Sequence, residues 1–64
     1  MSDVRVVLKS IIHDRGFSQA AIARKAKMSP AKLSNILNLR RRLEANDMFA
    51  LCDAMNINYS DLRP

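Results

Sequence analysis

Residues that build disulfides, tight loops and aromatic platforms are scarce in this sequence. Its 64 residues include one cysteine, one glycine, two prolines and no tryptophan. A lone cysteine, Cys52, cannot form a disulfide within the chain, so we expect a reducing, cytoplasmic location. The first residues contain neither a positively charged segment nor a long apolar run. We therefore expect no secretory signal and no membrane span.

The side chains that perform most acid–base and metal chemistry are also few. The chain has one histidine, His13, beside its one cysteine. It has no pair of acidic residues at a spacing that suits general acid–base catalysis or metal binding. We therefore expect a protein that is not an enzyme, has no catalytic residues and binds neither a cofactor nor a metal.

Acidic residues are absent from the middle of the chain. From Arg15 to Leu43 there are eight basic residues and no acidic one, whereas the rest of the chain has three basic and six acidic residues. A surface that is charged only for solubility would mix the two signs. This segregation predicts that the middle of the chain faces a polyanion such as a nucleic acid.

What the sequence does contain is a helical pattern of apolar residues. From about Asp3 to Arg15 they recur at intervals of three and four residues, as on one face of an amphipathic helix. Gly16 suits the left-handed residue that ends such a helix. Ser18 is a favourable N-cap for a second helix, which we expect to end near Lys27.

The stretch AKMSPAKLSNILN, Ala26 to Asn38, contains an abrupt break in this pattern. Ser29 is a favourable N-cap, and Pro30 suits the first position of a helix, where its missing N–H would have no helical partner. The stretch therefore predicts that one helix ends and another begins at this point. The apolar residues expected to face inward from the new helix are Leu33, Ile36 and Leu37.

A further helix is expected from about Ala45 to Met55, followed by Asn56 in the left-handed conformation. Asn58 and Asp61 have the spacing of a capping box, which indicates a final short turn. No segment has the pattern of a strand. The sequence thus predicts an all-α fold, a compact four- to five-helix bundle that forms a single domain over residues 1–64.

This arrangement resembles the helix-turn-helix of lambdoid phage repressors and Cro proteins over about residues 17–62, with the helix-turn-helix at about residues 19–38. The resemblance rests on Gln19 at the start of the first helix, the small Ala23 within it, and Leu33 and Ile36 in the second. It implies a lambda-repressor-like DNA-binding domain. The partner that it implies is double-stranded DNA.

The resemblance also implies roles for individual side chains. Asn35 would pair with adenine, Lys32 would reach guanine or a phosphate, and Ala31 would meet a thymine methyl group. The residues implied to face the bases are Pro30, Ala31, Lys32 and Asn35. Those implied to contact the DNA backbone are Gln19, Ser29, Asn38, Arg40, Arg41 and Arg42. Pro30 stands where the family often has glutamine, so the family's base preference does not transfer to this chain.

Simpler roles for these residues stay open. Ser29 would serve as an N-cap alone, the run from Arg40 to Arg42 as a solubilising loop, and Asn35 as an inert surface residue. The family usually has glycine where this chain has Lys27. A left-handed lysine there costs about 1 kcal/mol relative to glycine, and a turn of another geometry is the alternative.

We expect a transcriptional regulator that binds an approximate palindrome as a homodimer, with Ile57 to Leu62, including Tyr59, at the dimer surface. Two alternatives remain. The first is an antitoxin that binds DNA and also a toxin partner. The second is a small helical protein-interaction module that does not bind DNA.

Overall fold

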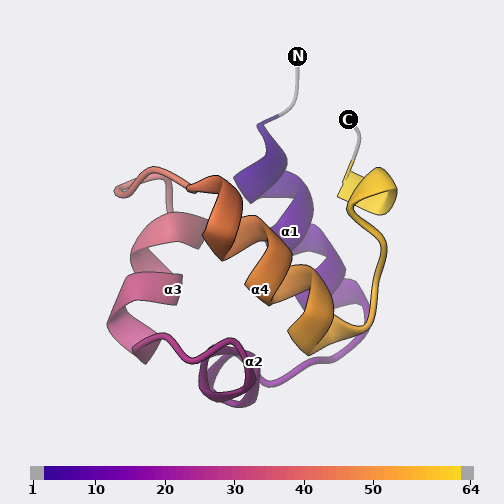
Figure 1. The fold of residues 1–64 in the computed structure, drawn as a ribbon, viewed down its shortest axis with the longest axis horizontal. Coiled ribbons are helices and arrows are strands. Elements are labelled where there is room, and N and C mark those ends of the chain that lie inside the picture. The colour runs from indigo at the N-terminus through magenta and orange to yellow at the C-terminus, as the bar shows by residue number, and fades with distance from the viewer. Residues whose placement is uncertain (1–2, 63–64) are drawn as a thin grey trace.

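The computed structural model describes residues 3–62, which form four α-helices and one 3-10 helix (Figure 1). The elements are α1 (Val4–Asp14), α2 (Gln19–Lys25), α3 (Pro30–Leu37), α4 (Ala45–Met55) and η1 (Tyr59–Leu62). No strand occurs among these described residues. The all-α fold predicted from the sequence is confirmed, and α2 ends two residues earlier than expected. No helix in the described part is long and apolar enough to cross a membrane.

The helices pack around one core. α2 packs against α3 and α4, α1 packs against α3 and η1, and η1 also contacts α4. Figure 1 shows α2 almost end-on while α4 runs across the view, so these two helices cross steeply. Ala23, on the inner side of α2, is fully buried. Because its side chain is small, the backbone of α2 can approach its neighbours closely.

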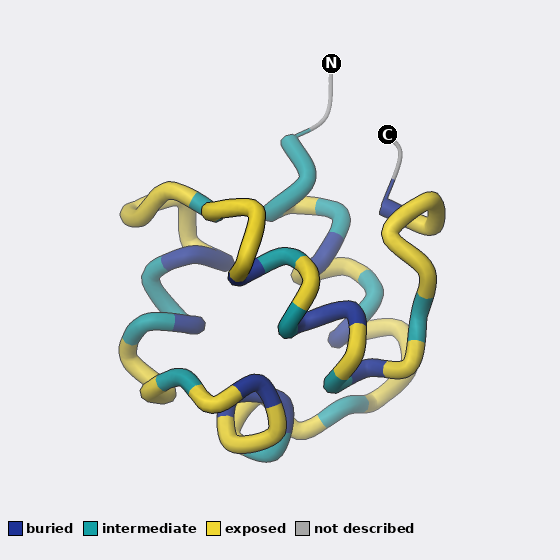
Figure 2. The backbone as a smooth tube through the Cα atoms, in the orientation of Figure 1, coloured by how far each residue is buried: buried dark blue, intermediate teal, exposed yellow. Residues whose placement is uncertain are grey.

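Each element contributes at least one buried apolar side chain to the core. The side chains that are fully buried and largest are Leu8, Leu33, Ile36, Leu51 and Leu62. Figure 2 shows the buried segments turned toward the centre of the molecule, with exposed backbone around them. The inward residues expected for α3 are all buried. Burial of one such side chain contributes roughly 1.5–3 kcal/mol, so the core fixes the position of α3.

α1, α2 and α3 begin at side-chain N-caps, and those at Ser18 and Ser29 are the ones predicted from the sequence. The Asp3 carboxylate accepts from the backbone N–H of Arg5 at 2.8 Å. Ser18 accepts from Ala21 at 3.3 Å, and the Ser29 hydroxyl accepts from the N–H of Lys32 at 3.1 Å. An N-cap of this kind contributes about 1 kcal/mol.

All four α-helices end in the same backbone motif, with a left-handed residue just after the last turn. Those residues are Gly16 (φ 68°), Lys27 (φ 59°), Leu39 (φ 64°) and Asn56 (φ 54°). The N–H of the following residue then donates to the carbonyl five residues earlier, in the pairs Phe17–Ile12, Met28–Ala23, Arg40–Asn35 and Ile57–Cys52. Lys27 is therefore left-handed, so the turn keeps the geometry that glycine usually provides.

Candidate functional site

α3 presents two kinds of surface. Leu33, Ile36 and Leu37 are buried, whereas Pro30 and Ala31 at its start are exposed. Asn35 lies one turn further along and is half-buried. The exposed side of α3 therefore begins with two small apolar residues and continues to an amide that can both donate and accept hydrogen bonds.

The start of α3 leaves a hydroxyl donor available. The Ser29 oxygen accepts from the backbone N–H of Lys32, and Ser29 is exposed. Because a hydroxyl donates through its own hydrogen, this cap does not use the donor. Gln19 is likewise exposed, at the first position of α2. Capping and phosphate contact are thus compatible roles for Ser29.

Lys32 is directed toward α4. Its Nζ atom donates to Oδ1 of Asp47 at 2.9 Å. The two side chains are 30% and 11% exposed, so the ion pair is partly buried. Asp47 lies in the first turn of α4 and is the only buried polar or charged residue in the described part of the chain.

Asn38 also has partners within the protein. Its Oδ1 atom accepts from Nζ of Lys9 at 3.0 Å, and its amide nitrogen donates to the carbonyl of Ser34 at 2.9 Å. The residue is exposed. Lys9 belongs to α1, so this contact ties the end of α3 to α1.

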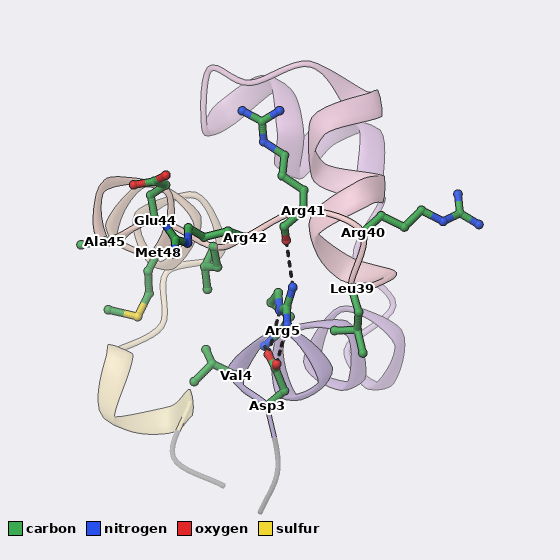
Figure 3. Close-up of a pocket in the computed structure, with 11 residues that line it drawn as sticks. Asp3, Val4, Arg5, Leu39, Arg40, Arg41, Arg42, Glu44, Ala45 and Met48 are labelled. Carbon is green, nitrogen blue, oxygen red and sulfur yellow. Dashed lines mark hydrogen bonds and ion pairs between the residues drawn. The ribbon is translucent and has the colours of Figure 1, made fainter.

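The loop after α3 carries the basic run. Arg40, Arg41 and Arg42 are all exposed. In Figure 3 the guanidinium groups of Arg40 and Arg41 point in different directions, each away from Arg5. The carbonyl of Arg41 instead faces Arg5, whose Nη1 atom donates to it at 3.0 Å. The loop backbone is therefore held on α1 while its charged groups stay outside.

Arg5 is itself held by Asp3. Its Nε and Nη2 atoms donate to the Asp3 carboxylate at 2.9 and 2.6 Å. These side-chain hydrogen bonds, with the Arg5 backbone N–H second, lower the pKa of Asp3 from 3.8 to about 2. The same pairing raises the pKa of Arg5. The first turn of α1 thus presents a fixed donor to the loop.

An open groove of about 760 Å³ lies between the start of α1, the loop that carries Arg40 to Arg42 (the arginine loop) and α4 (Figure 3). Its walls include the apolar residues Val4, Leu39, Leu43 and Met48. The guanidinium groups of Arg40 and Arg41 point outward. The concentration of positive charge thus faces solvent around the loop rather than the interior of the groove.

The rest of the described chain offers no centre for metal chemistry. Residues 3–62 contain no group of three or more His, Cys, Asp or Glu side chains placed to hold a metal ion. Cys52 is buried on the inner side of α4. Burial, followed by the charges of Asp53 and Asp61, raises the pKa of its thiol, so Cys52 is a neutral core residue.

Sequence reasoning missed three residues at this site: Arg5, Leu39 and Asp47. Asp47 had a signal, since it follows Glu44 by three residues and its Oδ2 atom accepts from the Glu44 N–H at 3.4 Å. Arg5 and Leu39 had none, because the contact of Arg5 is 36 residues away along the chain and leucine rarely adopts a positive φ.

Residues 7–63 match the family model described as the Cro/C1-type HTH DNA-binding domain. The fold is similar to that of the clp gene regulator ClgR from C. glutamicum, with a TM-score of 0.86 and 22% identity over 92% of this chain and 77% of that one. It is also similar to that of the restriction-modification controller protein C.AhdI from Aeromonas hydrophila, with a TM-score of 0.85 and 17% identity over 94% and 91% of the two chains. At these identities the two structures show a shared fold. No curated protein matches the sequence.

Proposed function

The chain belongs to the Cro/C1-type helix-turn-helix DNA-binding family, and from that premise we propose that it is a sequence-specific transcriptional regulator that places α3 in the major groove of double-stranded DNA. The observation that carries the proposal is the position of α3. Its exposed start lies in the chain between two exposed basic segments, one from Arg24 to Lys27 (with Ala26 buried) and the other from Arg40 to Arg42.

The proposed base contacts come from the outer side of α3. Pro30 and Ala31 offer apolar contact, for example with thymine methyl groups, and Asn35 can pair with adenine through two hydrogen bonds. Lys32 belongs to the same stretch, but its amino group is paired with Asp47 in the free protein. We therefore expect Asn35 to contribute most of the discrimination, since one bidentate pair is worth about 1–3 kcal/mol.

The proposed backbone contacts flank α3. Gln19 and Ser29 lie before it, and Asn38 follows its last turn. Arg40, Arg41 and Arg42 supply positive charge to phosphates without reading sequence. Every one of these residues is exposed. We expect these contacts to provide affinity and the α3 contacts to provide specificity.

We also propose that the regulator binds as a homodimer through the face formed by α4 and η1. Tyr59 and Phe49 are 62% and 49% exposed, and their rings meet edge to face with centroids 6.0 Å apart. Exposed aromatic side chains this close together are typical of protein interfaces. A single module of this kind buries only about 600–1,000 Å² on DNA, so a second copy would raise affinity. Phe49 adds to the surface expected from the sequence, Ile57 to Leu62.

Selection from a randomised duplex library tests the proposal directly. The purified chain is expected to enrich an inverted repeat whose half-sites lie about 10 bp apart. Retention of DNA without enrichment would leave a basic domain that does not read bases. In that case a search for a protein partner, a toxin among the candidates, would be the next step.

A charge reversal in the arginine loop separates DNA binding from a protein-interaction role. Arg41→Glu is expected to abolish binding to the selected duplex, because it places a negative charge beside phosphates. Arg15→Glu makes the same change in net charge at the other end of α1 from the Arg5–Arg41 contact, and it is expected to weaken binding much less than Arg41→Glu. Unchanged affinity in Arg41→Glu would contradict the proposed interface.

A further inference from the structure

The ion pair between Lys32 and Asp47 turns toward α4 a lysine that was expected to face DNA. By its position on α3, Lys32 follows the exposed residues Pro30 and Ala31, where a cationic side chain could reach DNA. Its Nζ atom is instead 2.9 Å from Oδ1 of Asp47. This is the one ion pair between α3 and α4 in the part of the chain that the structure describes.

The carboxylate of Asp47 is also held by a contact at the start of α4 that does not involve Lys32. Its second oxygen, Oδ2, accepts from the backbone N–H of Glu44 at 3.4 Å. Asp47 lies in the first turn of α4, where the helix dipole favours a negative charge. Its side chain is only 11% exposed. Removal of Lys32 from this contact would leave a nearly buried carboxylate without its cationic partner, which is unfavourable.

We propose that Asp47 is a specificity-determining residue that acts by positioning Lys32. It holds the ammonium group against α4 when the protein is on DNA, so that α3 presents a surface without formal charge, formed by Pro30, Ala31 and Asn35. This inference rests on the proposed function, because it concerns what α3 presents to the major groove.

The position of Lys32 matters for specificity because charged side chains and amides contribute differently to DNA binding. A lysine in the groove reaches phosphates as well as guanine, and each phosphate contact strengthens binding to every sequence. An amide such as Asn35 gains a bidentate pair only at the correct base. Retention of Lys32 by Asp47 therefore lowers non-specific affinity and leaves discrimination to Asn35.

The test measures how affinity for a random-sequence duplex depends on salt. Four variants are compared with the unaltered chain: Asp47→Asn, Lys32→Met, the double variant, and Asp53→Asn as a control. The amide oxygen introduced by Asp47→Asn can still accept from the Glu44 N–H. Asp53 is an exposed residue of the same helix, so its substitution changes net charge equally without touching α3. Thermal unfolding of each variant checks that it is folded.

Asp47→Asn is expected to release Lys32 onto a phosphate and steepen the dependence of log affinity on log salt by about 0.9. This corresponds to a further loss of roughly threefold in affinity between about 50 and about 200 mM salt. Asp53→Asn and Lys32→Met are expected to keep the slope of the unaltered chain. The double variant is expected to match Lys32→Met. Library selection with Asp47→Asn is expected to gain guanine beside the Asn35 position.

Two results would overturn the inference. A shallower slope in Lys32→Met would show that Lys32 already contacts DNA. Equal slopes in Asp47→Asn and Asp53→Asn would show that Asp47 does not restrain Lys32. Because Lys32→Met leaves the α4 cap intact, the first result decides the matter even if Asp47→Asn does not fold. Binding by none of the proteins would instead refute the proposed function itself.

Discussion

The turn before α3 and the loop after it share a backbone motif but differ in the residue next to the left-handed position. In the turn, Lys27 is followed by Met28, which is half-buried and packs against the core. In the loop, Leu39 is followed by Arg40, which is exposed. The ends of α1 and α4 match the turn, since Phe17 and Ile57 also pack against the core.

This difference shows how one motif serves two purposes. An apolar residue after the left-handed position anchors the chain to the core, which is the usual arrangement. An arginine there leaves the loop without that anchor and places charge outside. The hydrogen bond from Arg5 to the Arg41 carbonyl supplies the missing attachment. The turn is therefore held by burial, and the loop is held by a polar contact that keeps its side chains free.

Alanine at the two equivalent positions gives the largest expected contrast. Met28→Ala is expected to lower the free energy of unfolding by about 1–2 kcal/mol, less than for a fully buried methionine because Met28 is half-buried. Arg40→Ala is expected to change it by less than about 0.5 kcal/mol and to weaken DNA binding. Thermal unfolding and a DNA titration check both. Equal losses of stability would contradict the distinction between turn and loop.

Substitutions to and from glycine test the strain of the left-handed backbone positions. Gly16→Ala is expected to cost about 1 kcal/mol, because a Cβ at Gly16 meets no atom within 4 Å and only the left-handed φ opposes it. Lys27→Gly and Leu39→Gly are expected to gain about 0.5 kcal/mol each, since relief of the left-handed strain exceeds the added flexibility of glycine. Chemical denaturation measures all three. A loss of stability in Leu39→Gly alone would indicate that its side chain packs usefully in the groove.

The smallest expected effect is the loosening of the arginine loop at low pH. Because the pKa of Asp3 is lowered to about 2, the Asp3–Arg5 pair contributes its full stabilisation above the unfolded pKa of 3.8, and this is lost as the pH falls through 2. We expect the arginine loop to loosen in that window before the Lys27 turn does. Amide hydrogen exchange at Arg41 and Met28 reports the two segments separately. Asp3→Asn is expected to loosen the arginine loop already at neutral pH and so remove this pH dependence, whereas Asp14→Asn, an exposed control, leaves it.

The sequence alone determined the features that depend on near neighbours. The caps at Asp3, Ser18 and Ser29 join residues two or three apart, and the apolar spacing of the helices repeats every three or four residues. The segregation of basic residues and the resemblance to the repressor and Cro family are likewise visible in the linear order of residues. These features predicted the all-α fold and led to the expectation that the helix beginning at Pro30 contacts DNA.

Only the tertiary structure decided which polar side chains are free. Lys32 and Asp47 are 15 residues apart, Lys9 and Asn38 are 29 apart, and Arg5 and Arg41 are 36 apart. No periodicity links such positions, because their distance depends on the angles at which packed helices cross. The left-handed φ of Lys27 and Leu39 has the same origin: burial of α2 and α3 demands a turn at these residues, and tertiary packing outweighs the local preference of lysine and leucine.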